Sequence, residues 1–226
     1  MGIEFDVFRR QRDVISLEEL NKQIHIFGLG TIGSWSALSV VKMGCMNITL
    51  HDFDVVEEHN IPNQFYSIID NGNLKTESLK DNLMRFSPTI TNIKIQNGRI
   101  ENSNVLDIDV IPYDIVVSAY DNMDARKSLY EKIKDIPNVW LIDGRMALEE
   151  FRIFTINTND EKQREAYERS LQQTKIVNLP CGARSIGFNG FVIGGVIGSV
   201  VKKILKNEPT PYEISMTLKN YQTIIE

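Results

Sequence analysis

Cysteine is scarce in this chain: Cys45 and Cys181 are the only two among 226 residues. Two thiols cannot form a four-cysteine zinc site or the disulfide framework of a small secreted domain. Residues 1–12 are charged and have no apolar core, so we expect no signal peptide. A chain with so few cysteines suits a reducing compartment, and we expect a cytoplasmic protein.

The sequence also lacks a long hydrophobic run and an excess of basic residues. Its most apolar stretch, residues 188–201, is about 14 residues long, which is below the roughly 20 needed to cross a bilayer. We predict a buried helix there, whose glycines let another backbone come close. The net charge of −5 argues against a general nucleic-acid binder, so we expect neither a membrane nor a nucleic acid as partner.

The hydrophobic pattern predicts one α/β domain over residues 1–226, without repeats or linkers. Strands are expected over residues 23–27, 46–51, 90–97, 114–119 and 139–143, with helices over 31–43, 72–86 and 122–135. This order indicates a doubly wound, mostly parallel Rossmann-like sheet. We expect a helical arm over residues 1–22. Residues 146–226 are expected to form an antiparallel extension (strands 151–157 and 212–218), a polar helix or mobile segment (160–173), a crossover loop and a C-terminal helix.

Three glycines mark the turn after the first predicted strand. Gly28, Gly30 and Gly33 follow a strand and open a helix, as the dinucleotide-binding motif requires. The first permits a tight turn, the second lets a phosphate approach the backbone, and the third lets helix and strand pack closely. The pattern predicts a nucleotide-binding core over residues 23–145. The alternative is a turn that serves packing only.

Two carboxylates follow the second predicted strand. Asp52 stands where an acidic side chain can accept both ribose hydroxyls of a nucleotide, although it could be a simple turn residue. Asp54 points the same way, because side chains alternate along a strand. Their mutual repulsion is reasonable if a cation or a ribose lies between them.

Several ordered motifs around this turn resemble the signature of the ThiF/MoeB family, the adenylating enzymes related to ubiquitin-activating enzymes. The resemblance covers roughly residues 5–145 and is weaker as far as residue 206. The motifs are Phe8-Arg9-Arg10-Gln11, Asp52-Phe53-Asp54-Val55-Val56-Glu57, Asn60-Ile61-Pro62-Asn63-Gln64, Gly72-Asn73-Leu74-Lys75, and Asp121-Asn122 with Arg126.

The resemblance implies a reaction and a role for each residue. A carboxylate, typically the C-terminal glycine of a ubiquitin-like protein or peptide, attacks the α-phosphorus of magnesium-bound ATP; pyrophosphate leaves and an acyl adenylate forms. By resemblance, Asp52 holds the ribose and Lys75 lies over the α-phosphate, while Asp54 is a nucleotide-binding candidate as the second carboxylate of the pair. Asp121 holds magnesium. Asn60 and Gln64 position the phosphates and nearby loops. The resemblance also implies a homodimer, in which Arg10 reaches the triphosphate across the interface.

Structural alternatives remain open for these residues. Lys75 could be a surface lysine of its helix, and Arg9 or Arg12 could stand in the register assigned to Arg10. Asp121 or Asn122 could cap the helix that follows. We interpret Arg126 as structural.

This chain departs from the family pattern in three ways. Asn63 stands where the family usually has an arginine, so one cation that faces the phosphates is missing, and Arg145 or Arg184 is a candidate substitute. The paired zinc cysteines of many members are absent, and Pro62 stiffens the loop. These differences indicate a divergent branch.

Cys181 lies in a predicted loop before the apolar helix, with Arg184 near in sequence, a setting that can lower a thiol pKa. The functional hypothesis is a cysteine that receives the activated carboxylate as a thioester. The alternative is a small residue packed beside Pro180, and Cys45 is predicted to be structural.

Asp143 and Arg145 end the fifth predicted strand at the same crevice. Arg145 could hold a substrate carboxylate or form a salt bridge with Glu149 or Glu150. The three histidines show no metal-ligand spacing and are interpreted as structural or surface residues: His25, His51 and His59. Two other functions stay open on this fold, an NAD-dependent oxidoreductase and a nucleotide-binding scaffold without catalysis.

Overall fold

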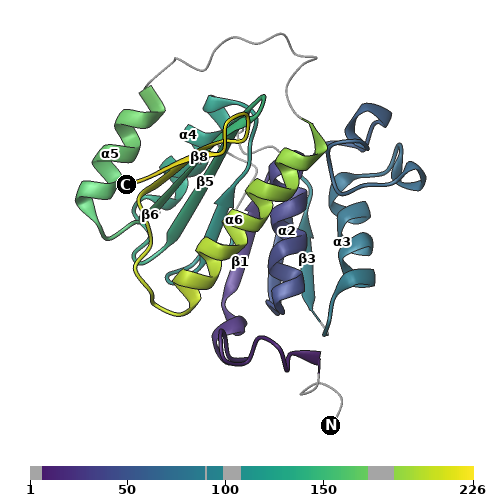
Figure 1. The fold of residues 1–226 in the computed structure, drawn as a ribbon, viewed down its shortest axis with the longest axis horizontal. Coiled ribbons are helices and arrows are strands. Elements are labelled where there is room, and N and C mark those ends of the chain that lie inside the picture. Colours follow the sequence, from purple (N-terminus) through teal and green to yellow (C-terminus); the bar gives the residue numbers. More distant parts are fainter. Residues whose placement is uncertain (1–6, 90, 99–107, 173–185) are drawn as a thin grey trace.

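A computed structural model describes residues 7–89, 91–98, 108–172 and 186–226 (Figure 1). Within this part of the chain, eight strands form one sheet in the order β3-β2-β1-β4-β5-β6-β7-β8. Neighbours from β3 to β5 pair in parallel, and those from β5 to β8 pair antiparallel. The strands are β1 (Gln23–Phe27), β2 (Asn47–His51), β3 (Asn92–Gln96), β4 (Ile115–Ser118), β5 (Trp140–Ala147), β6 (Glu150–Asn157), β7 (Glu213–Thr217) and β8 (Gln222–Ile225).

Helices cover both faces of this sheet, as the doubly wound prediction requires. One apolar cluster lies under α2 (Thr31–Met43), α3 (Lys75–Phe86) and α6 (Gly187–Leu205), and a second lies under α4 (Met123–Ile133) and α5 (Glu161–Gln172). The middle strands are apolar on both sides because each face meets its own cluster. In β1, Ile24 and Ile26 face the first cluster while Phe27 faces the second.

The predicted elements agree with the structure apart from a few boundaries. Of the expected helical arm over residues 1–22, residues 1–6 lie outside the described residues, and Val7 is helical. Residues 8–22 form turns and one 3-10 helix, η1 (Glu19–Asn21), rather than an α-helix. Helix α3 begins at Lys75 instead of residue 72, because Gly72 has a φ of +85° that no α-helix accommodates. Strand β8 was not predicted. All four of its residues are exposed, so it has no alternating hydrophobic pattern.

Helix α6 is the helix in the described ranges that is long and apolar enough to cross a membrane. It has 19 residues, which is more than the predicted 14, but it belongs to the core. It runs beside α2 in the same direction (Figure 1), and its glycines make the close approach possible. A Cβ at Gly194 would lie 2.7 Å from the Trp35 backbone, and one at Gly198 would lie 2.1 Å from Ser39 Oγ. The prediction of a buried, closely packed helix is therefore confirmed.

Candidate active site

The three glycines at the end of β1 differ in why they are needed. Gly28 has a φ of +84°, and a Cβ there would lie 2.9 Å from the Ala119 carbonyl oxygen. A Cβ at Gly33 would lie 1.9 Å from the Gly28 carbonyl oxygen. Packing alone therefore requires these two glycines. At Gly30 a Cβ would meet, among the described residues, Gln64 Nε2 alone, at 3.9 Å. No packing contact among the described residues therefore requires a glycine at position 30, which precedes the first turn of α2, where backbone amides favour an anion.

Asp52 holds the glycine turn to the end of β2. Its buried carboxylate accepts hydrogen bonds from the backbone amides of Leu29 at 2.6 Å, Phe53 at 2.7 Å and Asp54 at 2.9 Å. Burial raises the pKa of Asp52, and nearby Lys75 and the amides oppose that rise. A carboxylate has about four acceptor positions, so about one remains for a ribose hydroxyl. The proposed ribose contact stays a prediction.

Asp54 forms an ion pair with Lys75. The cation that offsets its negative charge is therefore a lysine of the same chain. Lys75 Nζ lies 3.0 Å from Asp54 Oδ2, and the Lys75 backbone amide donates to the Asp54 carbonyl at 2.9 Å. Lys75 is the first residue of α3, and its side chain is only 9% exposed. A buried ammonium at the positive end of a helix dipole is unfavourable, and a bound phosphate would offset that cost. The surface-lysine alternative is wrong.

The loop between β2 and α3 closes over the glycine turn. Asn60 Oδ1 accepts the Glu57 backbone amide at 3.0 Å within the 3-10 helix η2 (Glu58–Asn60), so Asn60 shapes the loop. Gln64 lies over Gly30, and Gln64 Oε1 is buried without a hydrogen-bond partner in the described ranges. Tyr66, which the sequence did not single out, donates to the Leu29 carbonyl at 2.9 Å.

Asp121 stands at the end of β4, next to the glycine turn. A Cβ at Gly28 would lie 3.1 Å from the Tyr120 backbone nitrogen, so the turn touches the residue before Asp121. Asn122 caps α4 by accepting the Ala125 amide at 2.8 Å. Capping therefore belongs to Asn122, and Asp121 presents an exposed carboxylate. No group of three potential acidic, histidine or cysteine ligands occurs in the described residues, so any metal here would draw its other ligands from a bound molecule and water.

Arg145 is not available for a substrate or for Glu149 and Glu150, which corrects both expectations. Its Nε donates to Asp143 Oδ2 at 2.7 Å, and its guanidinium lies 4.4 Å from the Phe154 ring centre. Arg145 also donates to the Ser170 carbonyl and hydroxyl on α5. It therefore does not replace the cation missing at residue 63.

Residue 63 contributes its backbone to the loop. The Asn63 carbonyl accepts from Trp35 Nε1 at 3.0 Å, which ties the loop to α2. Cys181 and Arg184, the remaining candidates of the crossover loop, lie outside the described residues.

Arg10 lies at the far end of α2 from its own glycine turn. Its neighbour Gln11 donates to the carbonyl of Met43, the last residue of α2, at 2.6 Å. A helix of 13 residues is about 20 Å long, so exposed Arg10 cannot reach a phosphate at the start of α2 in the same chain. Any contact with the triphosphate would have to come from a second copy, as the resemblance implies.

The other cysteine and two of the histidines are internal. Burial raises the pKa of Cys45 to about 12, which agrees with a structural role. His25 lies between His51, at 3.1 Å, and Asp114, at 3.2 Å. Neither contact was visible in the sequence. His59 is exposed and lies 3.1 Å from Glu57, as predicted for a surface residue.

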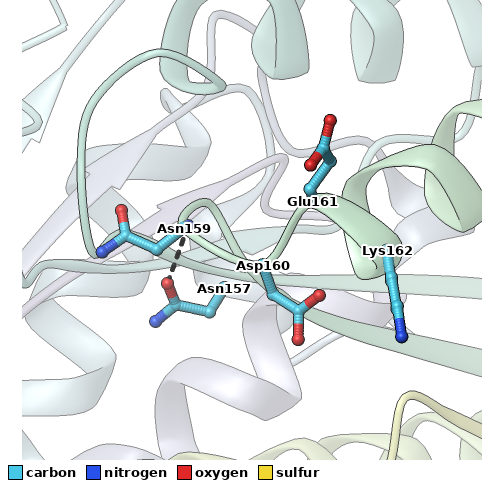
Figure 2. Close-up of a pocket in the computed structure, with 5 residues that line it drawn as sticks. All are labelled: Asn157, Asn159, Asp160, Glu161 and Lys162. Carbon is cyan, nitrogen blue, oxygen red and sulfur yellow. Dashed lines mark hydrogen bonds between the residues drawn. The ribbon is translucent and has the colours of Figure 1, made fainter.

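An open depression of about 460 Å³ occurs elsewhere (Figure 2). It is lined by polar residues at the end of β6 and the start of α5: Asn157, Asn159, Asp160, Glu161 and Lys162. Asn157 pairs with Trp140, the first residue of β5, so the depression lies at the opposite edge of the sheet from Gly30. It takes no part in the candidate site.

A model of the ThiF family matches residues 9–224. Ubiquitin-like modifier-activating enzyme 5 of Dictyostelium discoideum is 28% identical over 136 residues, which is 55% of this chain and 35% of that protein. The probable adenylyltransferase/sulfurtransferase MoeZ of Mycobacterium tuberculosis (strain CDC 1551 / Oshkosh) is 29% identical over 107 residues, which is 47% of this chain and 27% of that protein. The chain thus spans about a third or less of these curated relatives.

Solved structures show the same fold. E. coli MccB with ATP superposes with a TM-score of 0.75 at 19% identity, covering 92% of this chain and 64% of that one. MccB has also been solved with AMPCPP and MccA. At such identity the likeness shows the fold alone, which confirms the mostly parallel sheet with antiparallel C-terminal strands.

Proposed function

The chain belongs to the ThiF family, and from this premise we propose that it transfers the adenylyl group of ATP to a carboxyl terminus. The observation that supports this most strongly is a glycine at position 30 that no packing contact among the described residues requires, together with the buried Lys75, whose charge acts on Asp52 below the glycine turn. Two anions must meet in such a reaction, and an edge with helix amides and a buried ammonium suits them. A ubiquitin-like protein or a peptide is the acceptor that the family relationship favours.

The proposed step forms one bond and breaks one. A carboxylate oxygen of the acceptor attacks the α-phosphorus, the bond to the β-phosphate oxygen breaks, and an acyl adenylate and pyrophosphate result. Amides at the start of α2 and the Lys75 ammonium stabilise charge on the phosphate oxygens. Lys75 exchanges Asp54 for the phosphate, and Gln64 orients the phosphate above Gly30.

Magnesium is the cofactor that this chemistry requires beside ATP. The residues present fit it, because Asp121 is an exposed carboxylate next to the glycine turn, and the capping role falls to Asn122. Mg²⁺ commonly takes one or two carboxylates and fills its octahedron with phosphate oxygens and water. When bound, it neutralises charge on the leaving pyrophosphate.

A homodimer, a cytoplasmic location and a thioester intermediate complete the proposal. Arg10 reaches the triphosphate of a second copy, since its own glycine turn is a helix length away. Cys181 receives the acyl group after adenylation and releases AMP. A reductant-labile acceptor adduct that disappears in Cys181→Ala supports this transfer, and an adduct unaffected by that change removes it.

Exchange of labelled pyrophosphate into ATP tests the adenylation step. Protein, Mg²⁺ and ATP are incubated with peptides and ubiquitin-like proteins that end in a free glycine carboxylate. We expect acceptor-dependent exchange that Asp121→Asn abolishes. ATP binding without exchange across a broad acceptor panel supports the scaffold alternative, and binding of reduced nicotinamide cofactor in preference to ATP supports the oxidoreductase.

A further inference from the structure

The buried carboxylate of Asp143 lies at the centre of a network that ends beside Asp121. Asp143 Oδ1 accepts from Arg126 Nη1, and Asp143 Oδ2 accepts from Arg145 Nε at 2.7 Å and from the Tyr167 hydroxyl at 3.1 Å. The Asp143 side chain is fully buried, and that of Arg126 is 5% exposed. Burial therefore restricts the side chains of Asp143 and Arg126 to the conformations that form this ion pair.

Arg126 joins this carboxylate to the turn after β4. Its second terminal nitrogen, Nη2, donates to the Tyr120 carbonyl, which belongs to the peptide bond that leads into Asp121. The planar guanidinium makes both contacts at once, and the fork geometry fixes the angle between them. On the other side of Asp121, the Asn122 cap fixes the turn to α4.

Within the described part of the chain, little orients the Asp121 carboxylate itself. It is exposed, and the contact that the structure gives it is a weak one, from Asn122 Nδ2 at 3.4 Å. The backbone of residues 120–122, which Arg126 and the Asn122 cap hold in place, therefore sets where this side chain leaves the turn.

We propose that Asp143 and Arg126 are positioning residues, which aim the Asp121 carboxylate at the metal of a metal–nucleotide complex. The proposal rests on the proposed function, in which Asp121 binds Mg²⁺. Outer contacts of this kind typically change metal affinity by 10- to 100-fold when they are removed.

The network also makes a clean variant available. Two arginines share the single charge of Asp143, so Arg126→Gln leaves a balanced pair of Asp143 and Arg145. In contrast, Asp143→Asn would leave two buried guanidinium groups without a counter-charge, which strongly destabilises a protein. Arg126→Gln and the milder Arg126→Lys are therefore the variants to use, with thermal unfolding as the check on folding.

The experiment measures binding of Mn²⁺, as a probe for Mg²⁺, to the protein with a non-hydrolysable ATP analogue, by electron paramagnetic resonance. We expect Arg126→Gln to weaken Mn²⁺ binding about tenfold, while affinity for the metal-free nucleotide changes less than about twofold. Arg126→Lys should lie between, since an ammonium cannot reproduce the fork. The matched control is Arg152→Gln, which breaks the ion pair with Glu213 between β6 and β7 and should leave Mn²⁺ binding unchanged.

Folded Arg126 variants that bind Mn²⁺ as tightly as the wild type overturn the positioning proposal and leave the proposed function intact. If the wild type binds the nucleotide and Asp121→Asn does not weaken Mn²⁺ binding, Asp121 does not bind the metal, and the positioning proposal loses its basis. If the wild type binds no nucleotide, both the proposed function and this proposal fail.

Discussion

Two single-methyl substitutions in the glycine turn should have opposite effects. Gly30 has a φ of −74°, within the range of residues that carry a Cβ, and among the described residues a Cβ there meets nothing closer than 3.9 Å. Gly30→Ala should therefore keep or raise stability by about 0.4–1 kcal/mol, because alanine restricts the unfolded chain. The Gly33→Ala methyl would lie 1.9 Å from the Gly28 carbonyl oxygen and should lower stability by about 1–3 kcal/mol or more.

The two variants should also differ in nucleotide binding. In Gly30→Ala the methyl fills the place of a phosphate oxygen and removes a hydrogen bond to a charged group, which is worth about 1.5–3 kcal/mol. That loss corresponds to about 10- to 150-fold weaker ATP binding. In Gly33→Ala the main change is in melting temperature, which should fall by about 2–12 °C for a chain of this size.

Calorimetry measures both quantities, with thermal unfolding scanned in the presence and absence of Mg²⁺ and ATP. The wild type should gain melting temperature on adding ATP, and Gly30→Ala should gain little although it is at least as stable without ligand. If Gly30→Ala binds ATP as tightly as the wild type, no phosphate lies above Gly30. Gly30 is then not a phosphate-binding residue.

Three further predictions concern Lys75, His51 and Arg10. Lys75→Gln should weaken ATP binding about tenfold or more. It should change the free energy of unfolding by less than about 1 kcal/mol, because water screens the ion pair with half-exposed Asp54. Lys80→Gln on the same helix is the control, and equal effects of the two substitutions on ATP binding would refute a phosphate role for Lys75. Burial, and then His25, lower the pKa of His51 to about 3 from 6.5, so its stabilising contribution is present above pH 6.5 and is lost as pH falls toward 3. Urea unfolding between pH 6.5 and 4.5 should show a loss of up to about 1.4 kcal/mol per pH unit, and an equally steep loss in His51→Phe would assign the slope elsewhere. Mixing inactive Arg10→Ala with inactive Lys75→Ala should restore about a quarter of the exchange activity if Arg10 acts across a dimer, whereas a mixture that stays inactive rules that out.

Much of the fold was predictable because it depends on patterns that are local in the sequence. Apolar runs such as residues 23–27, followed by glycine turns, indicate buried parallel strands without reference to the rest of the chain. Strand β8 escaped prediction for the same reason, since its residues make only a hydrogen-bonded pair with β7 and bury nothing.

The positions of several candidate residues were predictable from the sequence, and their contacts were less so. The motifs brought Asp52, Lys75 and Asp121 to one edge of the sheet, and the structure agrees. That Asp52 would accept three backbone amides depends on how two loops fold against each other, which spacing does not reveal. The sequence offered Glu149 and Glu150 as partners of Arg145, but in the structure Arg145 pairs with the buried carboxylate of Asp143. An ion pair is stronger where water is excluded, and burial cannot be read from spacing.

The contacts of two histidines could not be predicted from the spacing of residues in the sequence. His25 and His51 are 26 residues apart and Asp114 lies 89 residues from His25, yet the three side chains touch. The parallel pairing of β1 with both β2 and β4 brings them together. Only the sheet order could have predicted the contact.

A crystal structure with Mg²⁺ and a non-hydrolysable ATP analogue would show whether the glycine turn, Lys75 and Asp121 bind one metal–nucleotide complex. Phosphate oxygens should lie above Gly30, with Lys75 Nζ within hydrogen-bonding distance of one of them and the Asp121 carboxylate bound to the metal directly or through water. A nucleotide bound at another edge, or one that leaves Gly30 uncovered while Lys75 stays on Asp54, would contradict the account.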